Sequence, residues 1–264
     1  MDRCLDTLEH CTFLESLHIT LSVEPNARSA RAPLSLPHLC DLYVSFQDGF
    51  DIASFLQPLH LPRVCTFEFY QRRPSYVICE AFWTAFRAFL ARSRPPLHEL
   101  CVGANSAARV LTPILTLLPT LEILDFRQAA PDPATLVALT PAPGGLWLCL
   151  RLRALYLVNV RLFDNEELIS LVQVRVPPGP WDGGGRPVGP SEGDEEVTEG
   201  RYLTELGVWN AMGVTGRVEK KLQALGHKGG DKMRFTIQRH PCYMGGHEWE
   251  ARGDLRMTTP KQFR

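Results

Sequence analysis

The sequence has little net charge and no long apolar run. Its 264 residues carry a formal net charge of −1, which provides no overall attraction for nucleic acid or for an anionic membrane surface. No apolar stretch approaches the roughly 20 residues that a bilayer-spanning helix needs, and the segment from Met1 to Asp6 lacks the apolar core of a secretory signal. We therefore expect a cytoplasmic or nuclear chain that has neither a membrane nor a nucleic acid as its partner.

Paired cysteines and catalytic signatures are also missing. The eight cysteines include no Cys-x-x-Cys pair, so we expect small buried apolar residues rather than a disulfide framework. The chain contains no Gly-x-Ser-x-Gly, His-Glu-x-x-His or kinase signature, and Gly183-Gly184-Gly185 is not followed by the Lys-Ser/Thr of a phosphate-binding loop. These absences predict a protein that is not an enzyme and that uses no cofactor.

The end of the chain holds the residues for an alternative. His240, Cys242 and His247, with His227 nearby, carry the imidazole and thiolate groups that bind zinc. They lack the paired spacing of a structural zinc module. We therefore expect no metal site, and a metal-binding or enzymatic protein that uses this part of the chain is kept as an alternative.

One short apolar pattern returns seven times along the chain. Each copy has a large apolar residue, a second one three positions later and a third one two positions further on. The copies begin 24 to 51 residues apart, which is close to the period of a leucine-rich repeat that carries insertions. The copies are Leu14-Leu17-Ile19, Leu39-Leu42-Val44, Val64-Phe67-Phe69, Leu97-Leu100-Val102, Leu121-Leu124-Phe126, Leu152-Leu155-Leu157 and Leu203-Leu206-Val208.

Each copy predicts a β-strand that has one buried face. Alternate side chains of an extended chain point to one face, so the second and third apolar residues of a copy enter the core together. A proline precedes several copies, as in Leu36-Pro37-His38-Leu39, where its fixed φ and missing N–H suit the start of a strand. Helical patterns fill the intervals, Gly226 suits the end of the last helix, and residues 235–237 predict a final strand. The expected helices span residues 51–59, 79–93, 106–118, 132–139, 164–174 and 215–225.

Together these patterns predict an α/β fold. We expect a leucine-rich-repeat solenoid, shaped as a horseshoe, with a parallel sheet on its concave face and helices on its convex face. This solenoid of about seven repeats spans residues 1–237. Residues 177–200 are rich in proline, glycine and acidic residues and are expected to form a disordered insertion, while residues 238–264 are expected to form an irregular polar tail.

The repeated strands also carry a resemblance to a known family. The Leu-x-x-Leu-x-Leu strands, the Leu-Pro-x-Leu starts and the opening around Leu8 resemble the leucine-rich-repeat region of fungal F-box proteins. The resemblance implies that the repeats recognise a target protein for a ubiquitin ligase. It implies a Skp1-type adaptor only if an F-box lies upstream, because Met1 falls almost directly before the first repeat. The hypothesis is a substrate receptor that lacks its F-box, as in a truncated gene model; the alternative is a stand-alone repeat scaffold.

The residues that alternate with the core pairs predict a partner-binding surface. They point to the concave face, where acidic and aromatic residues alternate and Arg127 is the only permanent cation. Aromatic residues with a polar tip are enriched among binding hot spots, and aligned carboxylates favour a basic protein partner. The plain alternative is a solvated sheet face that is polar by default. The predicted binding residues are Asp41, Tyr43, Glu68, Tyr70, Glu99, Asp125, Arg127, Tyr156, Glu205 and Trp209.

Overall fold

The computed structural model shows an α/β fold with one large parallel sheet. It describes residues 2–22, 33–47, 51–71, 80–103, 111–128, 133–140, 148–160, 165–176, 202–211, 214–228 and 233–238. The large sheet has eight strands in the order β1-β3-β5-β6-β7-β8-β9-β10, and β2 and β4 form a separate parallel pair. The strands are β1 (Ser16–Leu21), β2 (Leu34–Ser35), β3 (Asp41–Phe46), β4 (Leu59–His60), β5 (Thr66–Gln71), β6 (Glu99–Gly103), β7 (Ile123–Arg127), β8 (Ala154–Val158), β9 (Glu205–Trp209) and β10 (Arg234–Gln238).

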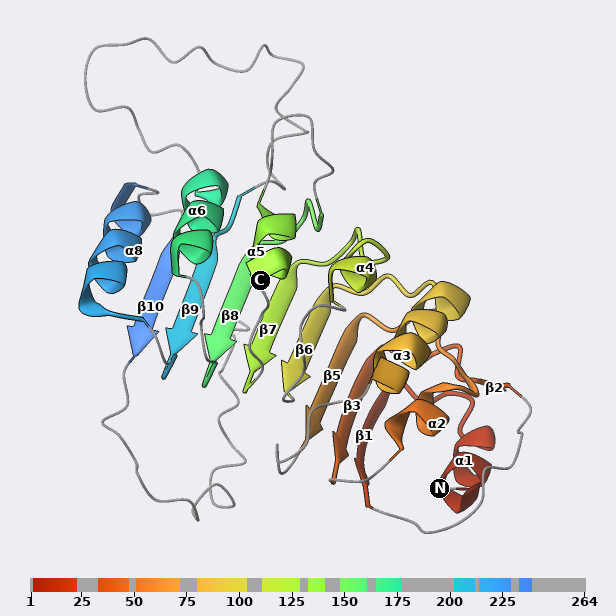
Figure 1. Cartoon of the computed structure of the whole chain (residues 1–264). Helices are drawn as coiled ribbons and strands as arrows, with labels where there is room; N and C mark the ends of the chain where they lie inside the picture. The colour runs from red at the N-terminus through yellow and green to blue at the C-terminus, as the bar shows by residue number, and fades with distance from the viewer. Residues whose placement is uncertain are drawn as a thin grey trace, which may run out of the picture.

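The helices stand in a row on one side of the large sheet (Figure 1). They are α1 (Asp2–Glu9), α2 (Ile52–Leu56), α3 (Glu80–Ser93), α4 (Leu111–Leu115), α5 (Pro133–Leu139), α6 (Asn165–Arg175) and α8 (Gly216–Lys228). Contacts join α2 to α3, α4 to α5, α5 to α6 and α6 to α8, so these helices pack against a neighbour along the chain. None of the helices in the described ranges is both long and apolar enough to cross a membrane.

The seven repeated copies supply seven of the eight strands. In the parallel register Leu42 lies opposite Phe67, and the same match continues along the sheet. The second and third apolar residues are buried in every copy except the first, where Leu17 and Ile19 are half-buried. These two residues lie on β1, which has a neighbouring strand on one side only.

Before six of the strands, one carbonyl accepts two hydrogen bonds from the following repeat. The carbonyl of Glu15 accepts from the N–H of Cys40 at 2.7 Å and from that of Asp41 at 3.1 Å. The same double acceptance recurs at five equivalent carbonyls further along the chain, those of Cys40, Cys65, His98, Glu122 and Arg153. The backbone therefore links successive repeats in the same way despite their different lengths.

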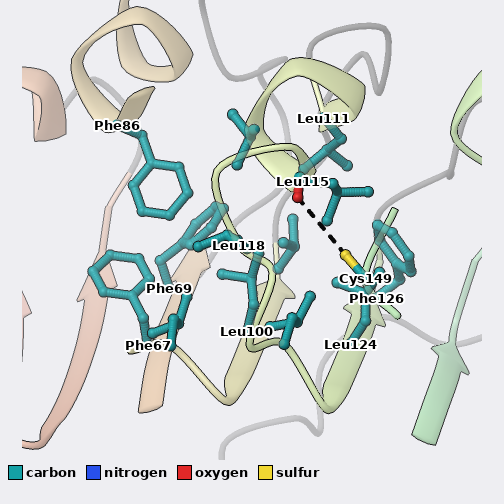
Figure 2. Close-up of a cluster of buried hydrophobic side chains, with 14 of the residues drawn as sticks. Phe67, Phe69, Phe86, Leu100, Leu111, Leu115, Leu118, Leu124, Phe126 and Cys149 are labelled. Carbon is teal, nitrogen blue, oxygen red and sulfur yellow. Dashed lines mark hydrogen bonds between the residues drawn. The ribbon is translucent and has the colours of Figure 1, made fainter. Parts of the chain in front are cut away.

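An aromatic cluster fills the core between α3 and the sheet. Phe86 of α3 lies with its ring centroid 5.0 Å from that of Phe67, and Phe82 lies 4.9 Å from Phe69. Figure 2 shows this cluster continuing into the aliphatic side chains under α4 and β7, where the thiol of Cys149 donates to the carbonyl of Leu115 at 3.8 Å. The aromatic side chains Phe82, Trp83, Phe86 and Phe89 of α3 are therefore part of the core.

The predicted helices are present, with some different ends. α2 begins after Asp51, whose side chain accepts a hydrogen bond from the N–H of Ser54 at 3.3 Å. The start of the helix expected over 106–118 lies outside the described ranges, and its expected end is wrong, because α4 ends at Leu115. The expectation for Gly226 is wrong, because α8 continues past it to Lys228. A Cβ at Gly226 would lie 3.2 Å from that of Phe235, so this glycine allows β10 to approach the helix closely.

Several predictions fall outside the described residues. The expected insertion at 177–200 and nearly all of the expected tail, residues 239–264, are among them. The tail includes His240, Cys242 and His247. Within the described ranges the cysteines are free thiols. Cys101 and Cys149 are buried as expected for small apolar residues, but the expectation is wrong for Cys4, Cys11, Cys40 and Cys65, which are only partly buried.

Two arginines at helix ends join neighbouring helices. Arg175, the last residue of α6, is fully buried and donates from Nε to the carbonyl of Leu139, the last residue of α5, at 2.9 Å. Its Nη1 and Nη2 atoms donate to the carbonyls of Cys149 and Leu148. Arg92 makes the equivalent contact from α3 to Leu56, the last residue of α2, at 3.1 Å. Carbonyls at the end of a helix have no donor within the helix and carry partial negative charge. A guanidinium supplies both the N–H donors and the positive charge.

Replacing Arg175 by Leu should lower the free energy of unfolding by about 2–4 kcal/mol, because three buried carbonyls would lose their donors. Arg217→Leu on the exposed surface of α8 is the control and should change stability by less than about 0.5 kcal/mol. Urea denaturation followed by circular dichroism measures both. Equal effects of the two substitutions would show that the buried guanidinium does not stabilise the helix layer.

Candidate interaction surface on the open face of the sheet

The sheet has an open face, which we define as the side opposite the row of helices. The strand register aligns its side chains into three rows. The predicted binding residues are distributed among these rows. Asp41, Glu99 and Glu205 lie in the first row, Tyr43, Glu68, Asp125 and Tyr156 in the second, and Tyr70, Arg127 and Trp209 in the third. The predicted residues therefore share one face, but they differ in exposure and in the contacts that they make.

Arg127 lies at the centre of a charged cluster. Its Nε donates to Oδ2 of Asp125 at 2.8 Å, and its Nη1 donates to Oε1 of Glu68 at 3.2 Å. Glu68 and Asp125 lie on β5 and β7, which are separated by β6, so the guanidinium bridges two strands that are not adjacent. Asp125 is only 3% exposed. We predicted it as a surface charge, but its position assigns it to holding Arg127 in place rather than to direct contact with a partner.

Carboxylates outnumber cations in this cluster. Burial raises the pKa of Asp125, although the adjacent Arg127 partly opposes this rise. Burial also raises the pKa of Glu99, and the negative charges of Glu68 and Asp125 raise it further. Both shifts show that the folded protein disfavours full ionisation of the cluster. One guanidinium faces three carboxylate side chains, so the centre of the open face has more acidic than basic groups.

Cys101 lies between the two carboxylate positions. It is opposite Glu68 on one side and Asp125 on the other, and it is 1% exposed. Burial, followed by the charges of these carboxylates, raises the pKa of its thiol well above the ordinary value. Because the thiolate is the nucleophilic form of cysteine, this residue is a small buried filler and not a nucleophile.

Two glycines make room for aromatic rings on the open face. A Cβ at Gly103 would lie 2.5 Å from Cδ2 of Tyr70, and one at Gly207 would lie 1.9 Å from the Trp209 ring. The Tyr70 hydroxyl also accepts a hydrogen bond from Nε2 of Gln128 at 3.2 Å. Both rings therefore lie flat across a neighbouring glycine, and their orientation is set before any partner binds.

Tyr156 connects the Trp209 ring to the acidic residues. Its ring centroid is 5.5 Å from that of Trp209. Burial raises the pKa of Tyr156, and the charge of Glu205 together with a hydrogen bond to its side chain raises it further. The tyrosine is therefore a neutral hydrogen-bond donor to Glu205, and its ring forms a half-buried platform together with Trp209.

The other end of the open face has a shallow hollow. His18 stacks on Tyr43 with ring centroids 4.0 Å apart and an interplanar angle of 16°. These rings, with Glu68 and Tyr70, line a hollow of about 200 Å³ between β1, β3 and β5. His18 was not among the predicted binding residues, although its alignment beside Tyr43 could have indicated the stack.

Other relevant residues were also missed by the sequence analysis. β10 adds Arg234, which lies opposite Glu205 in the first row, so Arg127 is not the only cation on the face. Gln128 was overlooked because it follows the end of a strand. The two glycines had a readable signal, since each aligns next to an aromatic residue or lies two positions before one.

The described part of the chain contains no cluster of three or more His, Cys, Asp or Glu residues arranged to hold a metal ion. The residues of the zinc alternative, His240, Cys242 and His247, lie outside this part. The arrangement of the described open face, with oriented rings and excess carboxylates, is suited to recognising another molecule by contact.

Replacing Gly207 by Ala should displace the Trp209 ring and destabilise the protein by about 1–3 kcal/mol through overpacking. Gly216→Ala is a matched control, because a Cβ there would meet nothing within 4 Å. Fluorotryptophan NMR, with the Trp209 resonance assigned through a Trp209→Phe variant, reports the ring position directly. An unchanged Trp209 resonance in Gly207→Ala would contradict the packing described above.

Replacing Glu99 by Gln should change how stability depends on pH. The pKa of Glu99 is raised in the folded state above its ordinary value of 4.5. Its contribution to stability is therefore present below that value and is lost as pH rises through the raised pKa. Relative to wild type, Glu99→Gln should gain stability as the pH rises above 4.5 and through the raised pKa. Urea denaturation at several pH values measures this difference, and a difference independent of pH would refute the assignment.

Comparisons with known proteins do not identify this chain. No model of a protein family, no curated protein and no solved structure matched it. The resemblance to the repeats of F-box proteins therefore rests on the residues of this chain alone. The function of the open face has to be inferred from its geometry and charge.

Proposed function

We propose that this chain is a leucine-rich-repeat solenoid that binds a protein partner along its open face. The observation that carries the proposal is the group of aromatic rings already oriented on that face. Tyr43 stacks on His18, Tyr70 lies across Gly103, and Trp209 packs against Tyr156. Rings held in place lose little conformational freedom on binding, and tyrosine and tryptophan are enriched among binding hot spots.

The repeated backbone pattern supports the solenoid. Six equivalent carbonyls each accept two N–H groups from the following repeat, and four pairs of helices that follow one another in the described chain, α2 with α3, α4 with α5, α5 with α6 and α6 with α8, are in contact. Units that contact mainly their neighbours are the basis of repeat architectures. We propose that the sheet lies on the concave side of a horseshoe, which would present the three rows of the open face to one extended partner.

The charge of the open face favours a basic partner. The three described rows contain five carboxylates, those of Asp41, Glu68, Glu99, Asp125 and Glu205, and two guanidiniums, those of Arg127 and Arg234. Complementary charge mainly accelerates association and excludes partners of the wrong sign. A basic or mixed basic and apolar segment is thus the partner that we propose.

The pathway is a separate part of the proposal. The resemblance to fungal F-box proteins predicts that the bound protein is a target of a ubiquitin ligase. In that case a Skp1-type adaptor would bind through an upstream F-box and not through the open face. A stand-alone scaffold would use the same face without an adaptor. Both alternatives therefore predict that a protein partner binds along the open face.

Substitution of the aromatic pair at the end of the open face tests this function. A partner is identified by affinity capture with the full chain, and its affinity is then measured by calorimetry. Trp209→Ala and Tyr156→Ala should each weaken binding by about 1–4 kcal/mol if they are anchors. Lys220→Ala on α8 is the control outside the open face and should leave affinity unchanged.

Charge reversal tests the electrostatic part. Asp41→Lys should slow association and weaken its dependence on salt, whereas Asp125 is unsuitable because a buried charge reversal would damage the fold. Unchanged affinity and association rate in all three open-face variants, with retained melting temperatures, would place the binding surface elsewhere.

A further inference from the structure

The hollow at the β1 end of the open face has the size of a single side chain. Its volume of about 200 Å³ is below the roughly 300–1,000 Å³ that is typical of small-molecule sites. Strand register places His18, Tyr43 and Glu68 side by side in one row, and Tyr70 lies in the next row. Three neighbouring strands therefore build the hollow, and no flexible loop is needed to complete it.

Aromatic rings form the walls of this hollow, and two of them are held by contacts. Tyr43 is stacked with His18 at a centroid distance of 4.0 Å. Tyr70 is fixed by the close approach of its ring to Gly103 and by the hydrogen bond from Gln128. The faces of tyrosine rings carry negative electrostatic potential and attract cations.

A carboxylate borders the same hollow. Glu68 has a side chain that is 25% exposed, and its Oε1 accepts from Arg127 at 3.2 Å. Within the described part of the chain, no donor lies against the other oxygen, Oε2. Because Glu68, Glu99 and Asp125 together share Arg127, Glu68 retains the capacity to pair with a second cation.

We propose that this hollow binds the side chain of an arginine from the protein partner. This inference rests on the proposed function and deepens it by naming the group that is recognised. The planar guanidinium stacks on aromatic rings and pairs with a carboxylate at the same time, which a compact ammonium does less well. The arginine of the partner would pair with Glu68 as Arg127 of the chain itself does.

A matched pair of peptides tests the proposal. The probes are short capped Gly/Ser peptides that carry one central arginine or one central citrulline, which has nearly the same shape but no charge. Binding to the isotopically labelled full chain is followed by NMR of the backbone amides. The arginine peptide should shift the signals of Tyr43, Glu68 and Tyr70, and the citrulline peptide should bind roughly tenfold more weakly or not at all.

Protein variants locate the contact. Glu68→Gln and Tyr43→Ala should each weaken arginine-peptide binding several-fold. Glu122→Gln is the matched control, since its side chain is 30% exposed just before β7 and pairs with His98 outside the hollow. The NMR spectra also report whether each variant is folded. Because Glu68→Gln disturbs Arg127 as well, Tyr43→Ala provides the second, independent variant.

The outcomes separate this inference from the proposed function. Equal binding of the two peptides, unchanged binding in both hollow variants, or no shift of the hollow signals at any soluble peptide concentration would overturn the arginine site. If a captured partner still depended on Tyr156 and Trp209, the proposed function would stand without it. If the arginine peptide bound the hollow while the partner ignored every open-face variant, the proposed function would fail instead.

Discussion

Each strand of the large sheet depends on the strand before it for its backbone hydrogen bonds and for burial of its apolar side chains. The doubly accepting carbonyls before six of the strands join one repeat to the next, and residues such as Leu42 and Phe67 lie opposite each other in register. A single repeat could satisfy neither requirement. The same dependence explains why Leu17 and Ile19 on the first strand are only half-buried, because no strand precedes them in the sheet.

On the helical side, the carbonyls at the ends of the helices also need hydrogen-bond donors. Helices that stand side by side leave carbonyls at their ends without partners. Arg175 and Arg92 each reach from the end of one helix to the last carbonyl of the helix before it. The charge of Arg175 is fully buried without a carboxylate beside it among the described residues, and burial lowers its pKa. Three carbonyl dipoles provide its compensation.

The residues of the open face make contacts with one another. Asp125 is buried and holds Arg127, which in turn reaches Glu68 at the edge of the hollow. The half-buried rings of Tyr70 and Trp209 lie across Gly103 and Gly207, which leave room for them. A surface with such internal contacts is already organised before binding, so its energetic cost of ordering is small. This organisation is the feature on which our proposal of a binding surface rests.

The apolar period by itself determined the strands, their parallel order and the rows on the open face, because side chains alternate along every extended strand. It could not determine which of those side chains touch. Arg127 pairs with Glu68 across an intervening strand, and Asp125 is buried although its row faces outwards. Gly226 lies inside a helix, at a point where Phe235 packs closely against it. These properties depend on distances between residues far apart in the sequence. Only packing of the whole sheet brings them together.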